Sequence, residues 1–179
     1  MLSETPVGPA DSKADTPGEN GFSSRNSPEL ERRPVLVRLR SGRTVDGSIH
    51  ISRGQPLIDM LAMKKSYLNL TEGRWSEEGD RVPHLSLRVQ EILWVMPRDG
   101  TLILSSAVPT SHSPRKVELH LVDGSTLNVT LSLASELRMS DYFESSPSFL
   151  PIWDVSGAIP EESRRLAVHE GAIMAIREL

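Results

Sequence analysis

Apolar and polar residues alternate in two separate stretches of the chain, and a glycine turn divides each stretch. In residues 35–51 every second position of the first strand is apolar, while Arg38 and Arg40 lie on the opposite face. Residues 117–133 repeat this pattern around Asp123-Gly124. A period of two predicts extended strands, and Asp-Gly is favoured in tight hairpin turns because both central residues can take positive φ. Each stretch is therefore predicted to form a β-hairpin.

The two hairpins belong to a longer internal repeat. An offset of 82 residues aligns residues 35–70 with residues 117–152 without a gap, and an offset of 81 then aligns 85–95 with 166–176. The matched positions are mainly the apolar ones that alternate. A repeat of this length predicts two copies of one structural unit.

The order of elements within a copy follows from the remaining pattern. After each hairpin the alternation is lost, and apolar residues at i,i+4 spacing predict a short helix at residues 56–63 and 138–145. An extended segment, a polar loop and two short strands joined by a tight turn then complete the copy. We expect a mainly β protein built from two tandem small five-stranded barrel-like domains, each with a short helix between its second and third strands.

The domain boundaries follow from the repeat and from composition. Copy 1 covers residues 31–98, copy 2 covers residues 114–179, and residues 99–113, which carry no charged residue after Asp99, form a linker. Residues 1–30 are acidic and rich in Pro, Gly and Ser, so they bury too little apolar area to offset the entropy of ordering. We expect this acidic tail to be disordered.

The arrangement of five short, bent strands resembles the Sm-like fold, bacterial Hfq in particular, and more generally an SH3-like barrel. The first hairpin, with Gly42, Gly47 and Ile49, is similar to that family's opening signature, and residues 168–176 are similar to its closing pair of strands. The resemblance implies a small barrel and RNA binding. Two features depart from the family: the helix follows the second strand instead of preceding the first, and Glu170-Gly171 replaces the Lys-His pair that contacts RNA.

A second resemblance is to an uncharacterised bacterial family of small β domains. Its pattern of a glycine hairpin, an Arg-Leu-Ser-Asp-like turn and a Phe-Leu-Pro-Leu segment is matched by residues 138–143 and 149–152 in copy 2, and more distantly by residues 56–61 and 67–70 in copy 1. This resemblance implies the domain boundaries and no activity.

Composition narrows the class of protein. The 179 residues carry a net charge of −4 with 37% hydrophobic residues, which indicates a soluble globular chain. The absence of cysteine from the sequence excludes disulfides, thiolate nucleophiles and cysteine zinc sites. The sequence has neither a long apolar run nor the basic and apolar start of a signal peptide, so we expect no membrane association and a cytoplasmic location.

Candidate catalytic chemistry is scarce. Asp59 and Asp141 recur in both copies, but each lies at the start of a short predicted helix, where a carboxylate is expected to act as a structural helix cap. The five histidines show no metal-ligand spacing, and the sequence contains no nucleophile elbow, P-loop or dinucleotide-binding motif. We therefore expect no enzymatic activity, no metal and no cofactor.

A basic cluster is the best candidate for an interaction patch. Arg38, Arg40 and Arg43 are predicted to lie on the solvent face of the first hairpin. Phosphate binding is one interpretation, but nearby acidic residues and few aromatic residues argue against nucleic acid. A cyclic-dinucleotide receptor of the PilZ type is set aside because Ile51 stands where its second motif requires glycine.

The sequence therefore favours a non-enzymatic protein-interaction or assembly module of a bacterial cytoplasmic complex. Its expected partner is an unidentified protein, and self-association into a homo-oligomer is a further expectation. An Sm-like RNA-binding protein is the alternative, and a small hydrolase without a recognisable motif is the third hypothesis.

Overall fold

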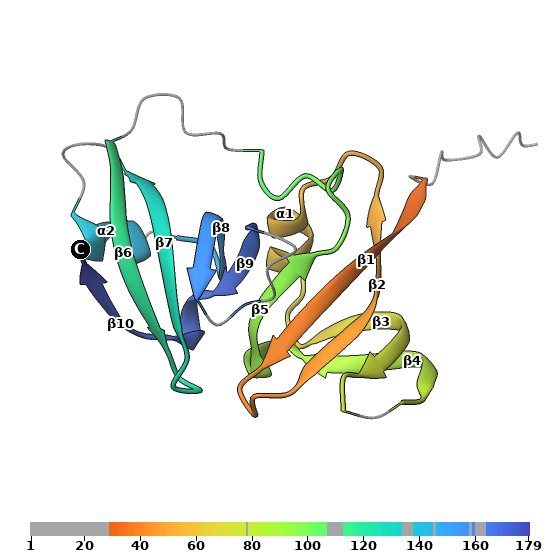
Figure 1. The fold of residues 1–179 in the computed structure, drawn as a ribbon. Helices are drawn as coiled ribbons and strands as arrows, with labels where there is room; N and C mark the ends of the chain where they lie inside the picture. The colour runs from red at the N-terminus through yellow and green to blue at the C-terminus, as the bar shows by residue number, and fades with distance from the viewer. Residues whose placement is uncertain are drawn as a thin grey trace, which may run out of the picture.

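The computed structural model describes residues 29–77, 79–106, 113–133, 138–144, 146–157, 159 and 164–179. The predicted acidic tail, apart from its last two residues, and residues 107–112 of the predicted linker lie outside these ranges. The described chain is mainly β, with short helices between strands (Figure 1). Within it, no helix has the length and apolar character needed to cross a membrane.

Ten strands form two groups of five. The N-terminal group contains β1 (Leu30–Leu39), β2 (Thr44–Ser52), α1 (Leu57–Ala62), β3 (Tyr67–Trp75), β4 (Arg81–Arg88), the 3-10 turn η1 (Val89–Glu91) and β5 (Ile92–Pro97). The C-terminal group contains β6 (Ser113–Leu121), β7 (Thr126–Leu133), α2 (Met139–Glu144), β8 (Phe149–Gly157), β9 (Leu166–His169), the 3-10 turn η2 (Glu170–Ala172) and β10 (Ile173–Glu178). The two groups have the element order that the sequence pattern predicts.

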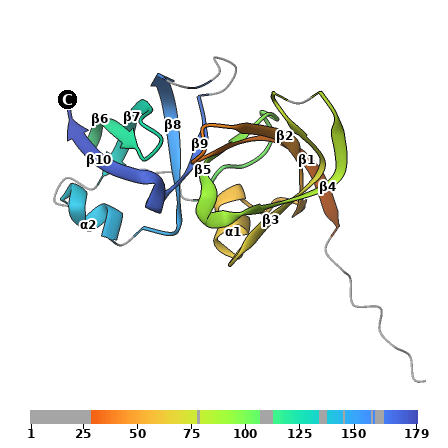
Figure 2. The ribbon, with the colours of Figure 1, turned by 90° about the horizontal axis from the view of Figure 1, so that it is seen from below.

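The prediction of a mainly β chain is confirmed, but two tandem barrel-like domains are not, because the ten strands of the described residues belong to one open antiparallel sheet. Its order is β10-β6-β7-β8-β9-β5-β1-β2-β3-β4, so each group contributes its fifth, first, second, third and fourth strands in that sequence. The groups meet where β5 pairs with β9. Figure 2 shows that the strands of the N-terminal group curl strongly around α1. The sheet does not close on itself, and β4 and β10 form its two outer edges.

Both predicted hairpins are confirmed. β1 pairs with β2 and β6 with β7 in antiparallel register. Gly42 and Gly124 take φ values of 81° and 82°, whereas Asp123 does not have positive φ. In the second hairpin, Leu121 N–H donates to Ser125 O at 2.8 Å, so three residues, 122–124, form the loop between these two. A loop of this length needs only one left-handed residue, which glycine supplies.

A bulge in the third strand of each group accounts for the loss of alternation there. The β2–β3 register shifts between Asp46 and Ser48, and the β7–β8 register shifts in the corresponding place. Next to these shifts, Glu72 and Asp154 take φ values of 51° and 53°. A bulge adds a residue without a partner and bends the strand. β3 and β8 therefore continue to Trp75 and Gly157, through residues that the pattern assigned to polar loops.

The hydrophobic core consists of two clusters. Each cluster is formed mainly by one strand group and also contains side chains from the other group. The predicted core residues are all buried: Val37, Leu39, Ile49, Leu119, Leu121 and Leu131. Phe149 and Ala167 from the C-terminal group pack in the first cluster. Four residues of the N-terminal group pack in the second cluster: Leu36, Leu93, Trp94 and Met96. The face of β1 that carries Arg38, predicted from the sequence to meet solvent, is thus partly covered by the other group.

The start of the predicted linker completes the N-terminal group. Leu102 and Leu104 are buried in the first core cluster. Main-chain carbonyls of this segment accept the first N–H groups of α1, with Leu57 N to Ile103 O at 2.8 Å and Ile58 N to Leu104 O at 3.1 Å. These donors have no partner within a helix, so the linker backbone satisfies them.

The predicted side-chain cap is absent from α1, and both repeated aspartates lie in the first turn of a helix. Pro56 is the N-cap residue of α1 and no side-chain hydrogen bond caps this helix, while Asp59 lies exposed in its first turn. Asp141 lies exposed in the first turn of α2 and accepts a hydrogen bond from Ser140 Oγ at 3.2 Å. Their expected contribution is a favourable interaction with the helix dipole.

The strand register predicts unequal effects at Leu121, the last residue of β6, and at Val122, which follows it. Leu121→Ala removes a fully buried side chain and should lower the free energy of unfolding by about 2–5 kcal/mol. Val122→Ser changes a side chain that is 40% exposed and should have a much smaller effect. Chemical denaturation of both variants checks this, and a severe Val122→Ser variant beside a neutral Leu121→Ala variant would contradict the register.

Candidate functional site

The junction between β5 and β9 gathers contacts from both strand groups and is the centre of the candidate site. Trp94 pairs with Val168 and Val95 with Ala167 along this junction. Arg40 spans the same place, because its Nε donates to Gln90 O at 2.6 Å and its Nη2 donates to Gly171 O. Main-chain pairing, buried side chains and a guanidinium group thus hold the two groups together.

The predicted arginine patch is divided between two places. Arg38 and Arg40 both bind the C-terminal group, Arg38 through an ion pair with Asp123 at 3.3 Å. Arg43 instead lies over the ring of Trp75, 4.1 Å from its centroid, and pairs with Glu77 at 3.5 Å. The sequence pattern identified Arg38 and Arg40 as interaction residues, but their shown contacts lie within the chain.

Asp123 is held as a carboxylate at this junction. Its side chain is 4% exposed, and burial alone would raise its pKa. Hydrogen bonds from the hydroxyl and N–H of Ser125, together with Arg38, hold the pKa of Asp123 below its ordinary value. The Asp123-Gly124 turn therefore provides a fixed negative charge for Arg38.

His169 is held as a neutral imidazole at the end of β9. Its Nδ1 accepts a hydrogen bond from Gly171 N–H at 3.0 Å, and its ring packs edge-on against Phe149 with centroids 4.9 Å apart. Burial lowers the pKa of His169, as does the positive charge of Arg40, while Glu170 acts in the opposite direction. Protonation would place an imidazolium beside Arg40 and would remove the acceptor for Gly171.

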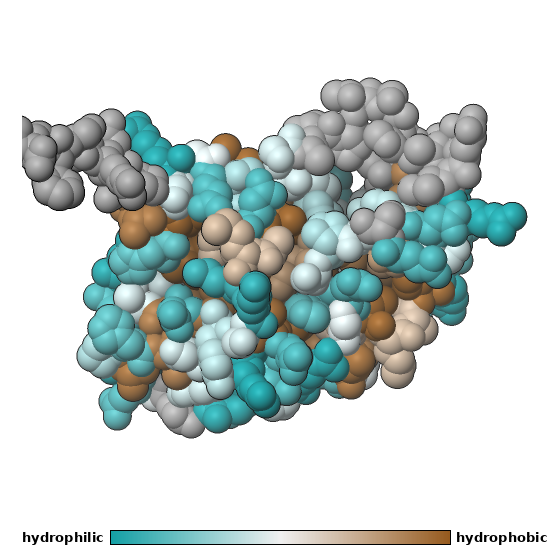
Figure 3. Space-filling view, turned by 180° about the vertical axis from the view of Figure 1, so that it is seen from behind, coloured by the Kyte–Doolittle hydropathy of each residue, from teal (hydrophilic) through white to brown (hydrophobic). Residues whose placement is uncertain are grey.

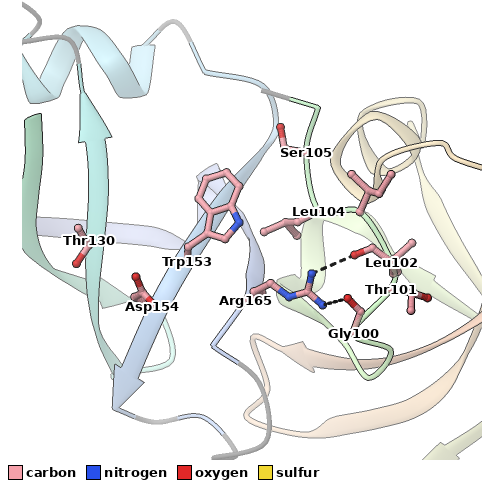
Figure 4. A pocket seen from close by; sticks show the side chains of 10 residues that line it. Gly100, Thr101, Leu102, Leu104, Ser105, Thr130, Trp153, Asp154 and Arg165 are labelled. Atoms are coloured by element: carbon pink, nitrogen blue, oxygen red, sulfur yellow. Dashed lines mark hydrogen bonds between the residues drawn. The ribbon is translucent and has the colours of Figure 1, made fainter. Parts of the chain in front are cut away.

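A hollow of about 500 Å³ lies beside the junction, between the linker segment and β8 (Figure 4). One wall is formed by residues 100–105 and the other by Thr130, Trp153 and Asp154, with Arg165 between them. Figure 4 shows the indole of Trp153 directed toward the linker segment and Arg165 reaching across to it. The hollow is large enough for a small ligand or a partner side chain.

The lining of this hollow combines apolar side chains with an arginine that is bound to the linker. Leu102, Leu104 and the partly buried Trp153 supply the apolar part of a lining that also contains polar side chains. Arg165 donates to three linker carbonyls, at distances of 3.3 Å from Leu102 O, 3.2 Å from Asp99 O and 3.1 Å from Gly100 O. The guanidinium therefore ties the linker to the C-terminal group and builds the wall of the hollow.

One contact between a hydroxyl and an imidazole lies elsewhere, on the surface of the N-terminal group. Thr71 Oγ1 lies 3.3 Å from His50 Nε2 and donates to Ser48 O at 3.3 Å. The described residues place no carboxylate in a hydrogen bond with His50. In the same part of the chain, no group of three or more His, Asp or Glu side chains is arranged to hold a metal ion.

Sequence reasoning missed Trp153, Arg165 and the linker wall. Residues 99–106 have no alternation that would indicate burial, and Arg165 follows a polar loop, so no local signal separates them from an ordinary connection. Comparison of the chain with protein-family models, curated proteins and solved structures found no match.

His169 predicts a pH dependence of stability. Its pKa is lowered in the folded state, so its contribution is present above the ordinary histidine pKa of about 6.5 and is lost as the pH falls below that value. His169→Asn keeps an acceptor for Gly171 and removes the titration. The native chain should therefore lose more stability than this variant between about pH 8 and about pH 5 in denaturant unfolding. Parallel curves would contradict the neutral state of the partly buried His169, because the variant keeps every other histidine.

Proposed function

We propose that the chain is a non-enzymatic protein-interaction and assembly module that associates head to tail with further copies of itself. The observation that carries this proposal is the pairing of β5 with β9, the fifth strand of one group with the fourth strand of the other. The same two strand types, β10 and β4, form the two ends of the sheet and have no outer neighbour among the described residues. An unpaired outer strand is a template for pairing with another chain.

The junction within the chain supplies the register for the proposed contact. At the offset of 81 residues, Leu87 of β4 corresponds to Val168 of β9, and Ala175 of β10 corresponds to Trp94 of β5. The proposed antiparallel partners in two copies are therefore Ala175 with Leu87, Ile176 with Ser86 and Met174 with Arg88. This contact joins two different surfaces, so it extends from copy to copy until the rotation closes a ring or continues as an open chain.

The outer contact should be weaker than the junction within the chain. The buried Leu36 and Met96 correspond to Glu118 and Arg177 in the C-terminal group, which form an exposed ion pair at 2.9 Å. Less apolar area is therefore available, and charged residues on an edge limit aggregation. We expect reversible association that depends on protein concentration.

The exposed surface is consistent with association through strand edges. Figure 3 shows apolar atoms at the surface of both groups, scattered among polar side chains on the face viewed from behind. Some of the exposed apolar side chains lie near the outer strands, including Tyr67 at 52% and Met174 at 67% exposed. Main-chain pairing with these side chains alongside gives the contact its specificity.

The Sm-like RNA-binding alternative has less support. Arg38 and Arg40, two of the three arginines on which it depended, are engaged by Asp123 and Gly171 at the junction. Binding of phosphate there would compete with contacts that hold the two strand groups together.

Sedimentation velocity of the full chain tests the assembly proposal. From about 5 μM to about 500 μM the mean mass should rise above that of one chain, with a dissociation constant of about 100 μM. Met174→Arg places a positive charge opposite Arg88 of a second copy and should weaken association by about tenfold. Adding Arg88→Glu should restore it.

Met63→Arg is the matched control, because Met63 is 72% exposed at the end of α1 and lies on neither outer strand. It should associate like the native chain. A monomer at every concentration, or equal weakening by Met63→Arg and Met174→Arg, would refute the proposed contact.

RNA binding is checked separately by fluorescence anisotropy with U-rich and A-rich RNA near physiological salt. We expect no binding tighter than about 10 μM. A tighter complex that is abolished when Arg38, Arg40 and Arg43 are all replaced by Gln would favour the RNA-binding alternative, since phosphate contacts position a protein without reading bases.

A further inference from the structure

A second hollow, of about 150 Å³, lies on the N-terminal group at the bulge in β2 and β3, away from the junction. It is lined by backbone around Gly47 and Ser48 and by six charged side chains. The charged residues come from four strands and the segment after β5: Arg32, Asp46, Glu72, Arg74, Arg81 and Arg98. Four guanidinium groups and two carboxylates give this lining a net charge of +2.

The carboxylates hold three of the arginines in place around the hollow. Glu72 pairs with Arg32 and, at 3.4 Å, with Arg81. Asp46 pairs with Arg98 at 3.4 Å. Glu72 lies at the bulge of β3 with positive φ, and its side chain pairs with one arginine from β1 and one from β4. The carboxylates therefore position three of the arginines, and the lining contains two more arginines than carboxylates.

Arg74 is the unsatisfied member of this cluster. Its backbone faces Asp46 on β2 and Arg81 on β4. Its Nε is buried and has no hydrogen-bond partner, and within the described residues Arg74 forms no ion pair. A buried donor without an acceptor is costly, so an oxygen atom of a water or of a bound anion would be stabilised at this position.

We propose that this hollow binds one doubly charged oxyanion, the phosphate group of a small phosphorylated metabolite. A net charge of +2 matches a phosphate dianion, and guanidinium groups donate paired hydrogen bonds to its oxygens. A volume of about 150 Å³ admits a single tetrahedral group. A nucleic acid is a poorer fit, because the net charge of the whole chain is −4.

The proposed anion site is independent of the proposed assembly. In the register given above, the last residue of the chain, Leu179, would lie opposite Pro83 of a second copy. Arg81 lies beyond that point, and the other charged residues of the hollow lie on other elements. Loss of either function by mutation therefore leaves the other measurable.

Titration of the full chain with inorganic phosphate tests the proposal, by calorimetry and by ³¹P NMR line width, at constant ionic strength with chloride as the reference. Phosphate should bind with a dissociation constant of about 1 mM, and chloride should not replace it. Arg74→Gln should weaken phosphate binding at least about fivefold. Arg81→Gln, at a side chain 62% exposed, should weaken it without affecting the fold, so the test does not depend on the stability of the Arg74 variant.

Arg53→Gln is the matched control, since Arg53 is 74% exposed on the same group and outside the hollow. It should bind phosphate like the native chain. Absence of phosphate binding, or equal weakening by the Arg53 and Arg74 variants, would overturn the site. An RNA of about ten nucleotides that binds far more tightly than phosphate, with a steep salt dependence that Arg74→Gln reduces, would overturn the assignment to a small ligand.

Discussion

The pairing of β5 with β9 is the constraint on which the rest of the structure depends. It turns two groups of five strands into one sheet, and it brings Trp94 of the N-terminal group into the core of the C-terminal group. In the opposite direction Phe149 enters the first core cluster. Because each group supplies part of the other's core, neither can lose the junction without exposing apolar surface. Arg38, Arg40 and Arg165 add polar contacts around this exchange.

Much of the local structure could be predicted from the sequence. The alternation in residues 35–51 and 117–133 predicts both hairpins and the buried positions on their inner faces, and spacing predicts two short helices. The alternation could not predict whether the outer face of the hairpin meets solvent or is buried by another part of the chain. Leu36 shares that face with Arg38, and its burial depends on a group that begins some eighty residues later in the chain. A pattern with a period of two identifies two faces but does not say what packs on the second.

The residues of the candidate sites were harder to predict from the sequence than the strands and helices. Arg38 and Arg40 could be recognised as interaction residues because they share one short strand, although their partners proved to be in the same chain. The hollow proposed to bind an anion is lined by Arg32, Arg74 and Arg98, which are far apart in sequence and meet only through the strand order and the bulge at Glu72. No linear motif encodes that meeting. The outer strands β4 and β10 likewise become evident as unpaired edges only once the order of the whole sheet is known.

Native-state hydrogen exchange tests the central role of the junction most directly. Residues 94–95 and 167–168 face one another across it. If the junction makes the two groups one cooperative unit, the amides that bond across it should exchange only through global unfolding, with the same free energy as the most protected amides of β1 and β7. Exchange of these amides through a separate opening of much lower free energy, with β1 and β7 still protected, would show instead that the two groups are independent domains in contact.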